Sequence, residues 1–102
     1  KTVAAIHDLS GSGRGSLTTV IPILSAMGVR VCPMPTAILS ATTEFEHYSF
    51  LDLTDYLPEY ISNWEKNRIT FDCIYSGFLG SSKQIEIVSN FIDTFKRYIG
   101  SD

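Results

Sequence analysis

The stretch that decides the fold of this chain is TVAAIHDLSGSGRGS, at residues 2–16. Its first part, residues 2–7, is an apolar run without polar alternation, which is typical of a strand buried on both faces of a parallel sheet. The remainder is rich in glycine and serine, and Ser16 can cap a helix over residues 17–27 that ends at Gly28. A buried strand, a glycine loop and a helix in this order predict an α/β domain.

Further apolar runs alternate with helical patterns along the chain. Residues 29–34 read as a second strand that the nearby prolines end, and residues 36–40 as a separate short strand. We expect an edge strand at residues 47–50 and a third buried strand at residues 71–75. Strands that alternate with helices predict a mostly parallel sheet with right-handed crossovers.

Three helices are expected between or after these strands. Pro22 lies inside the first and predicts a kink or a late start, because proline removes a backbone donor. The second opens near Asp52, Thr54 or Pro58, and its buried face is predicted to carry Leu57, Ile61 and Trp64. The third begins with a capping box at Ser81 and Gln84, ends at Gly100 and is predicted to bury the stripe Ile85, Val88, Ile92, Phe95 and Ile99.

Composition narrows the class of protein. The chain has 102 residues, which we interpret as one domain spanning 1–102, and 8 Lys+Arg against 11 Asp+Glu. Because the cations are scattered, a nucleic acid is not expected as the main partner, and no apolar run approaches the roughly 20 residues of a membrane span. Cys32 and Cys73 lie in apolar runs and are predicted to be reduced core thiols of a cytoplasmic protein.

The loops at the carboxyl ends of the predicted strands, 7–16, 40–46 and 76–81, are where a parallel sheet binds ligands. The first is one residue short of a dinucleotide fingerprint and lacks the acidic residue about 20 positions further on, so an NAD site is disfavoured. With no lysine between Lys1 and Lys66, a P-loop is excluded. The glycines then serve either a backbone contact with a small ligand or a plain tight connection.

Side chains in these loops offer binding groups without a complete catalytic or metal-ligating set. Asp8 could bind a ligand or cap a turn, and the hydroxyls before Glu44 could meet a ligand or only solvent. Phe78, between Gly77 and Gly80, could stack on a flat ring or fill the core.

Taken together, four stretches resemble the pyridoxal/pyridoxamine (vitamin B6) kinases of the ribokinase-like superfamily. They are AIHDLSGSGR at residues 5–14, PILSAMG at 22–28, VCPMPTAILS at 31–40 and SGFLGS at 76–81, the last followed by Gln84 and Ile85. The resemblance implies a three-layer ribokinase-like sheet and ATP-dependent phosphorylation of the 5′-hydroxymethyl group of pyridoxal, pyridoxamine or pyridoxine. It also implies Mg²⁺, often with K⁺, and a cytoplasmic homodimer.

By position in the family, Asp8 matches a residue that faces the polar edge of the pyridine ring, and Thr43 matches a substrate-contacting threonine. Phe78 matches an aromatic residue that is commonly tyrosine. With Ser10, Gly11, Glu44 and Gly77, these residues are the predicted substrate-binding set, and no catalytic or metal-binding residue is assigned. Relatives usually carry histidine where this chain has Thr42, and glycine or glutamine in place of Glu44.

Family members are more than twice as long as this chain, and their nucleotide site and general base lie in the C-terminal half. The chain is therefore expected to be the N-terminal, substrate-binding half of such a kinase, with ATP bound elsewhere and with an open or apolar sheet edge. Two alternatives stay open: a non-catalytic α/β binding module, and a hydroxymethylpyrimidine kinase, whose fold and acceptor are similar.

Overall fold

The apolar run near the start of the chain forms the central strand of a four-stranded sheet. The computed structural model describes residues 1–77 and 79–99, and there β1 (Thr2–Ser10) buries its side chains from Val3 to Ile6 almost completely. It pairs in parallel with β2 (Arg30–Leu39) on one side and with β4 (Cys73–Ser76) on the other. A short strand, β3 (Phe50–Asp52), adds antiparallel to the end of β2, so the order is β3-β2-β1-β4.

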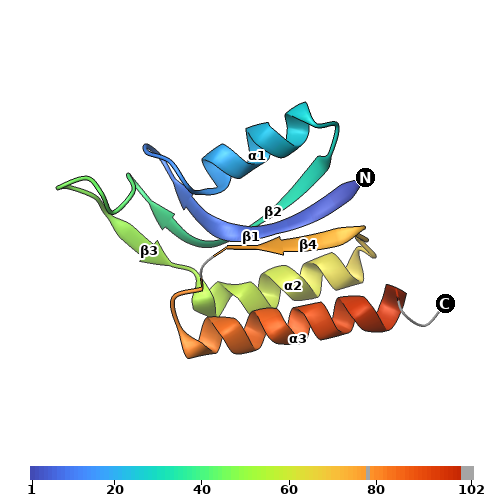
Figure 1. The fold of residues 1–102 in the computed structure, drawn as a ribbon. Coiled ribbons are helices and arrows are strands. Elements are labelled where there is room, and N and C mark those ends of the chain that lie inside the picture. Colours follow the sequence, from blue (N-terminus) through green and yellow to red (C-terminus); the bar gives the residue numbers. More distant parts are fainter. Residues whose placement is uncertain (78, 100–102) are drawn as a thin grey trace.

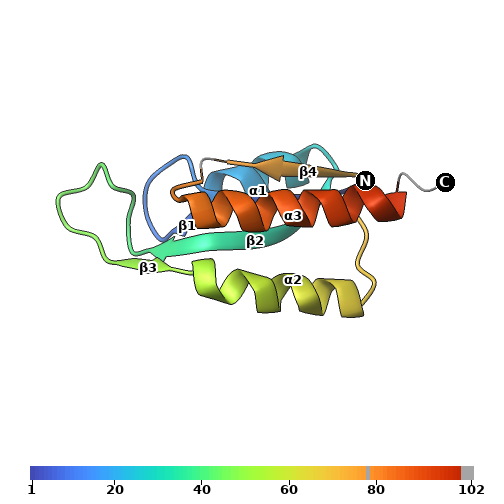
Figure 2. The same cartoon turned by 90° about the horizontal axis from the view of Figure 1, so that it is seen from below.

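Helices cover both faces of this sheet, as the predicted three-layer fold requires. Helix α1 (Leu17–Ala26) lies on one face, and α2 (Leu57–Lys66) and α3 (Ser82–Ile99) lie on the other (Figure 1). A turn of 3-10 helix, η1 (Thr54–Tyr56), precedes α2. The view from below shows the two edge strands, β4 and β3, on opposite sides of β2 (Figure 2), as the sheet order requires. The mostly parallel α/β fold is therefore confirmed.

The main core lies between the sheet and the pair α2 and α3. Sheet residues Ala4, Ile6 and Met34 pack there with residues of the two helices and of the segment before β4. As predicted, Leu57 and Ile61 are buried and Trp64 packs against the same cluster, where its ring meets those of Phe71 and Phe91. None of the described helices is long and apolar enough to cross a membrane.

The strands differ from the predicted ones at their ends. β1 continues through the start of the predicted glycine loop to Ser10, after a register irregularity between His7 and Leu9. β2 is one strand where two were predicted, with Pro33 and Pro35 inside it. Residues two apart in a strand direct their backbone N–H positions to the same side, so both prolines leave the donor missing on one side of β2. Because β3 pairs with β2 only from Ala37 onward, no hydrogen bond between these two strands is lost.

Helix boundaries were predicted more closely. Ser16 caps α1 by accepting from the Thr18 N–H, and the helix begins at Leu17, so the late start considered for Pro22 is wrong. Pro58 lies in the first turn of α2. The Gln84 N–H donates to the Ser81 Oγ at 3.2 Å, which confirms one half of the predicted capping box of α3, whereas the Gln84 Oε1 accepts from the Gly80 N–H in place of the Ser81 N–H. The predicted stop at Gly100 lies outside the described residues.

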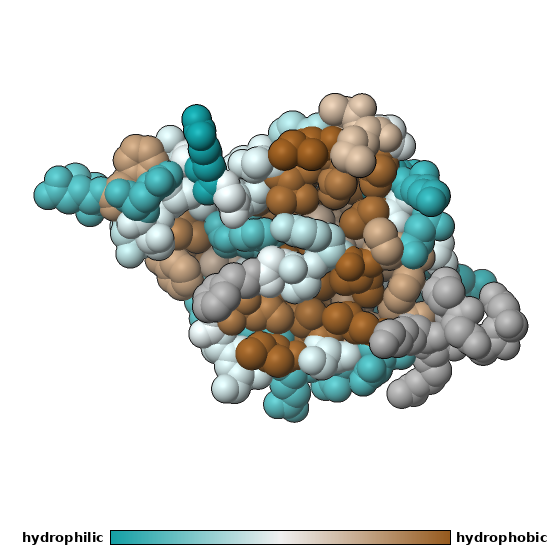
Figure 3. Space-filling view, in the orientation of Figure 1, coloured by the Kyte–Doolittle hydropathy of each residue, from teal (hydrophilic) through white to brown (hydrophobic). Residues whose placement is uncertain are grey.

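The outer edge of β4 carries no partner strand among the described residues. Apolar side chains gather over α1 and α3 on either side of it (Figure 3). Ile23 of α1 is 55% exposed, and Met27, which caps the C-terminal end of that helix, is 70% exposed. The apolar surface expected at an open sheet edge is thus present. Two core predictions are wrong for the same reason: Cys73 on β4 and Ile85 on α3 are exposed because no described residue covers this side.

Candidate functional site

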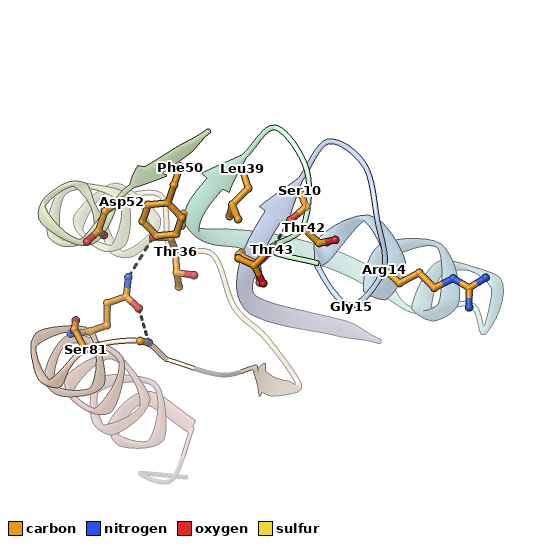
Figure 4. A pocket seen from close by; sticks show the side chains of 14 residues that line it. Ser10, Arg14, Gly15, Thr36, Leu39, Thr42, Thr43, Phe50, Asp52 and Ser81 are labelled. Atoms are coloured by element: carbon orange, nitrogen blue, oxygen red, sulfur yellow. Dashed lines mark hydrogen bonds between the residues drawn. The ribbon is translucent and has the colours of Figure 1, made fainter. Parts of the chain in front are cut away.

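A cavity of about 460 Å³ opens where the strands β1 and β2 end. Figure 4 shows the side chains that line it. All three predicted loops, 7–16, 40–46 and 76–81, contribute to the lining, so their predicted convergence is confirmed. The remaining lining residues are on β2, on β3 and in the first turn of α3. The lining residues are Asp8, Ser10, Arg14, Gly15, Thr36, Ala37, Leu39, Thr42, Thr43, Phe50, Asp52, Gly80, Ser81 and Gln84.

Two side chains near Asp8 at the end of β1, those of His7 and Ser10, hold its carboxylate in place. The Ser10 hydroxyl donates to Asp8 Oδ2 at 3.0 Å, and His7 Nδ1 lies 2.7 Å from Asp8 Oδ1. Nδ1 also lies 2.9 Å from the Asp8 backbone N–H, so it donates to the Asp8 carboxylate in the Nδ1-protonated tautomer and accepts from that N–H in the other. A carboxylate has about four acceptor positions, so Asp8 keeps capacity for a donor that enters the cavity.

The glycine loop is fastened to the turn after β2 by backbone contacts. The Gly11 N–H donates to the Leu39 carbonyl at 2.9 Å, and the Thr42 N–H donates to the Ser12 carbonyl at 2.8 Å. A Cβ on Gly11 would lie 2.7 Å from the Ser40 carbonyl oxygen. Gly11 is therefore required by this approach of two main chains, although it does not line the cavity itself.

The turn after β2 divides its polar side chains between the cavity and solvent. Thr43 lines the cavity, as predicted, and so does Thr42. The Thr42 hydroxyl donates to Glu44 Oε1 at 2.9 Å, and Glu44 is exposed and is not among the lining residues. The structure therefore does not place the Glu44 carboxylate in the cavity, because the Thr42 hydroxyl holds it to its own turn.

The third loop contributes through its second half. Gly77 packs against His7, where a Cβ would lie 2.2 Å from the imidazole Cδ2, and it does not line the cavity. Gly80 and Ser81 do line it. The predicted aromatic contact, Phe78, lies outside the described residues.

Among the described residues of the predicted set, only Asp8, Ser10 and Thr43 line the cavity, and several of the other lining residues could not be predicted because their positions depend on pairing between distant segments. Phe50 and Asp52 are on β3, Thr36 is inside β2, and Gln84 was noted for a helix cap and for the family resemblance but not as a site residue. Phe50 is 60% exposed, so its ring is available to a flat ligand. Hydrogen bonds from the Thr54 hydroxyl and backbone N–H hold the pKa of the Asp52 carboxyl below its usual value.

Arg14 was also not assigned to the site, and it lines the cavity through its position in the first loop. Its guanidinium group points away from Ser10, Thr42 and Thr43 in Figure 4. Among the described residues, no three His, Cys, Asp or Glu side chains come together as a metal site would require. The described cavity therefore offers polar groups for a small molecule, and no Mg²⁺ site is assigned within it.

No protein-family model and no curated protein sequence matches the chain. Solved structures do. A candidate phosphomethylpyrimidine kinase from Bacteroides thetaiotaomicron is 60% identical over 93% of the chain, with a TM-score of 0.91, and another crystal form of it contains pyridoxal. Pyridoxal kinase from Lactobacillus plantarum is 29% identical over 91% of the chain, with a TM-score of 0.85. Pyridoxal kinase from Leishmania donovani, in complex with ADP and pyridoxamine, shares the fold at 12% identity over 98% of the chain, with a TM-score of 0.92.

The chain spans about a third of the length of each of these proteins, with 33%, 34% and 36% of their residues covered. The chain has the ribokinase-like α/β fold. In sequence and structure it resembles a segment that makes up about a third of the length of a pyridoxal kinase and of a candidate phosphomethylpyrimidine kinase.

Proposed function

We propose that this chain forms the vitamin-binding part of a kinase that phosphorylates pyridoxal, pyridoxamine or pyridoxine at the 5′-hydroxymethyl group. The observation that carries the proposal is the cavity in which Asp8, Ser10 and Thr43 meet. It is supported by the 60% identity to a protein that was crystallised with pyridoxal. The cavity volume of about 460 Å³ lies within the usual range for a small-molecule site.

The chemistry of the lining suits a flat ring with polar substituents. Leu39 and Ala37 supply apolar contact, and Phe50 supplies an aromatic face for offset stacking. The Asp8 carboxylate accepts a hydrogen bond from a hydroxyl group or from a protonated ring nitrogen, and a hydroxypyridine ring offers both. Thr43 adds a hydroxyl that donates or accepts. These groups bind and orient an acceptor alcohol.

Phosphoryl transfer also needs a donor, positioned cations and an oriented nucleophile. We infer that the donor is ATP with Mg²⁺, with K⁺ as a further cation, bound by residues other than those of the described cavity. The L. donovani relative binds ADP, which supports a nucleotide donor. On the same resemblance we propose that the protein is a cytoplasmic homodimer.

A second candidate function is phosphorylation of a hydroxymethylpyrimidine. The B. thetaiotaomicron relative, a candidate phosphomethylpyrimidine kinase, favours a pyrimidine as the ring of the acceptor. Both acceptors are flat aromatic rings with a hydroxymethyl group, so the cavity lining suits either. We place the pyridine first because that same relative was crystallised with pyridoxal.

The test is a direct comparison of acceptors with the protein that carries this chain. ATP-dependent product formation is measured with pyridoxal, pyridoxamine, pyridoxine and hydroxymethylpyrimidine, and binding of each acceptor is measured by calorimetry. We expect the highest kcat/KM with one of the three pyridines. A higher kcat/KM with the pyrimidine would favour the second function, and binding without any ATP turnover would favour a non-catalytic binding module.

A further inference from the structure

Gln84 lies where three elements meet at the wall of the cavity. It is in the first turn of α3, it is only 7% exposed, and it lines the cavity together with Thr36 and Asp52. A buried side-chain amide is costly unless its donors and acceptor are paired. A buried amide at this position therefore needs hydrogen-bond partners within the protein.

The amide of Gln84 is paired on every side. Its Nε2 donates to the Thr36 carbonyl on β2 at 3.2 Å and to the Thr54 Oγ1 on η1 at 2.9 Å. Its Oε1 accepts from the Gly80 N–H at 3.4 Å, in the turn before α3. Thr54 in turn donates its hydroxyl hydrogen to Asp52, another lining residue. These hydrogen bonds connect β2, η1 and the start of α3, and two of them are drawn in Figure 4.

We propose that Gln84 is a positioning residue that sets the width of the cavity. It holds the Gly80–Ser81 turn and the start of α3 against β2 and η1. Both of its donor hydrogens and its acceptor oxygen are engaged by protein groups, so it acts on an acceptor through the walls that it joins. This role rests on the proposed function, because the cavity is taken to receive the vitamin.

Two substitutions separate the hydrogen bonds of Gln84 from its volume. Gln84→Glu keeps the shape but removes both donors and turns a carboxylate toward the Thr36 carbonyl. Gln84→Met keeps a similar volume without polar atoms or charge, so it tests the proposal even if the buried carboxylate prevents folding. The matched control is Glu86→Gln, which replaces a carboxylate by an amide at an exposed position two residues further along α3.

The variants are compared by hydrogen exchange of the Gly80 amide and by calorimetric binding of pyridoxal, under conditions in which each is fully folded. We expect Gln84→Met to speed exchange at Gly80 about tenfold and to weaken pyridoxal binding about tenfold, with Glu86→Gln unchanged in both. A variant that only lowered overall stability would leave the binding constant of the folded protein unchanged.

Unchanged pyridoxal binding in both Gln84 variants would overturn the positioning role, whether or not exchange at Gly80 is faster. If the wild-type protein binds none of the pyridine acceptors, the proposed function fails separately. The exchange rate at Gly80 then decides alone whether Gln84 holds the wall: faster exchange supports this, and an unchanged rate contradicts it.

Discussion

Replacement of Gly77 by alanine tests how the first and third loops are packed together. A Cβ at this position would lie 2.2 Å from Cδ2 and 2.5 Å from Nε2 of His7, whereas an ordinary contact between carbon atoms is about 3.5–4.0 Å. The two groups must therefore separate by more than about 1 Å. Either the imidazole turns and loses its 2.7 Å contact with Asp8, or the chain moves and loses the 2.8 Å bond from the Gly77 N–H to the Ile6 carbonyl.

Overpacking of this kind costs about 1–3 kcal/mol, so we expect the free energy of unfolding of Gly77→Ala to fall by that amount. Urea denaturation followed by fluorescence measures it. The structural reason is tested by repeating the substitution in a His7→Ala background, where the clashing ring is absent. There the cost of Gly77→Ala should shrink, with a coupling energy of about 1–2 kcal/mol between the two positions.

Gly80→Ala is the matched control, because a Cβ at Gly80 meets nothing within 4 Å. It should change the free energy of unfolding by less than about 0.5 kcal/mol. If Gly77→Ala costs the same with and without the His7 ring, the close approach of these two residues is not the cause, and the packing of the first loop on the third is refuted.

Three further predictions concern the core, the alkaline limit of stability and the candidate site. Leu57→Ala removes a side chain that is fully buried and should lower the free energy of unfolding by about 2–5 kcal/mol in urea, whereas the exposed Leu51→Ala should cost less than about 0.5 kcal/mol. Burial raises the pKa of Tyr60 above its ordinary value of 10.0, so its contribution to stability is complete below pH 10.0 and is lost as the pH rises through the higher folded value. Tyr60→Phe should remove this part of the alkaline loss in denaturation midpoints, and an identical pH profile would contradict it. Asp8→Asn removes the negative charge from the side chain that accepts the hydrogen bond, and it should weaken pyridoxal binding about tenfold by calorimetry. Unchanged affinity would show that Asp8 does not contact pyridoxal.

Most of the fold could be predicted because its elements have local causes. The apolar run of β1, the Ser16 cap of α1 and the Ser81 cap of α3 are all short-range signals, and each is where it was expected. The continuity of β2 could not be predicted in the same way. Whether a proline breaks a strand depends on which side of it is paired, and that is decided by β3, more than ten residues further along the chain.

The site was predictable in part for a similar reason. Asp8 and Ser10 lie at the carboxyl end of β1 and Thr43 follows that of β2, and the carboxyl-end rule of parallel sheets is enough to bring them to one cavity. Phe50 and Asp52 reach the cavity only because β3 pairs antiparallel with β2. Gln84 carries a helix-cap signal that explains its backbone N–H but says nothing of its side-chain Nε2, which donates to groups 30 and 48 residues away.

The fastening of the glycine loop to the turn after β2 makes the cavity unequal on its two sides. Main-chain hydrogen bonds join Gly11 to Leu39 and Thr42 to Ser12, and no change of rotamer can release them. The opposite side is joined by the side chain of Gln84, which a rotation about its own bonds can free. We therefore expect the side of the cavity formed by the glycine loop and its turn to be the more rigid one, and the side next to α3 to open more readily.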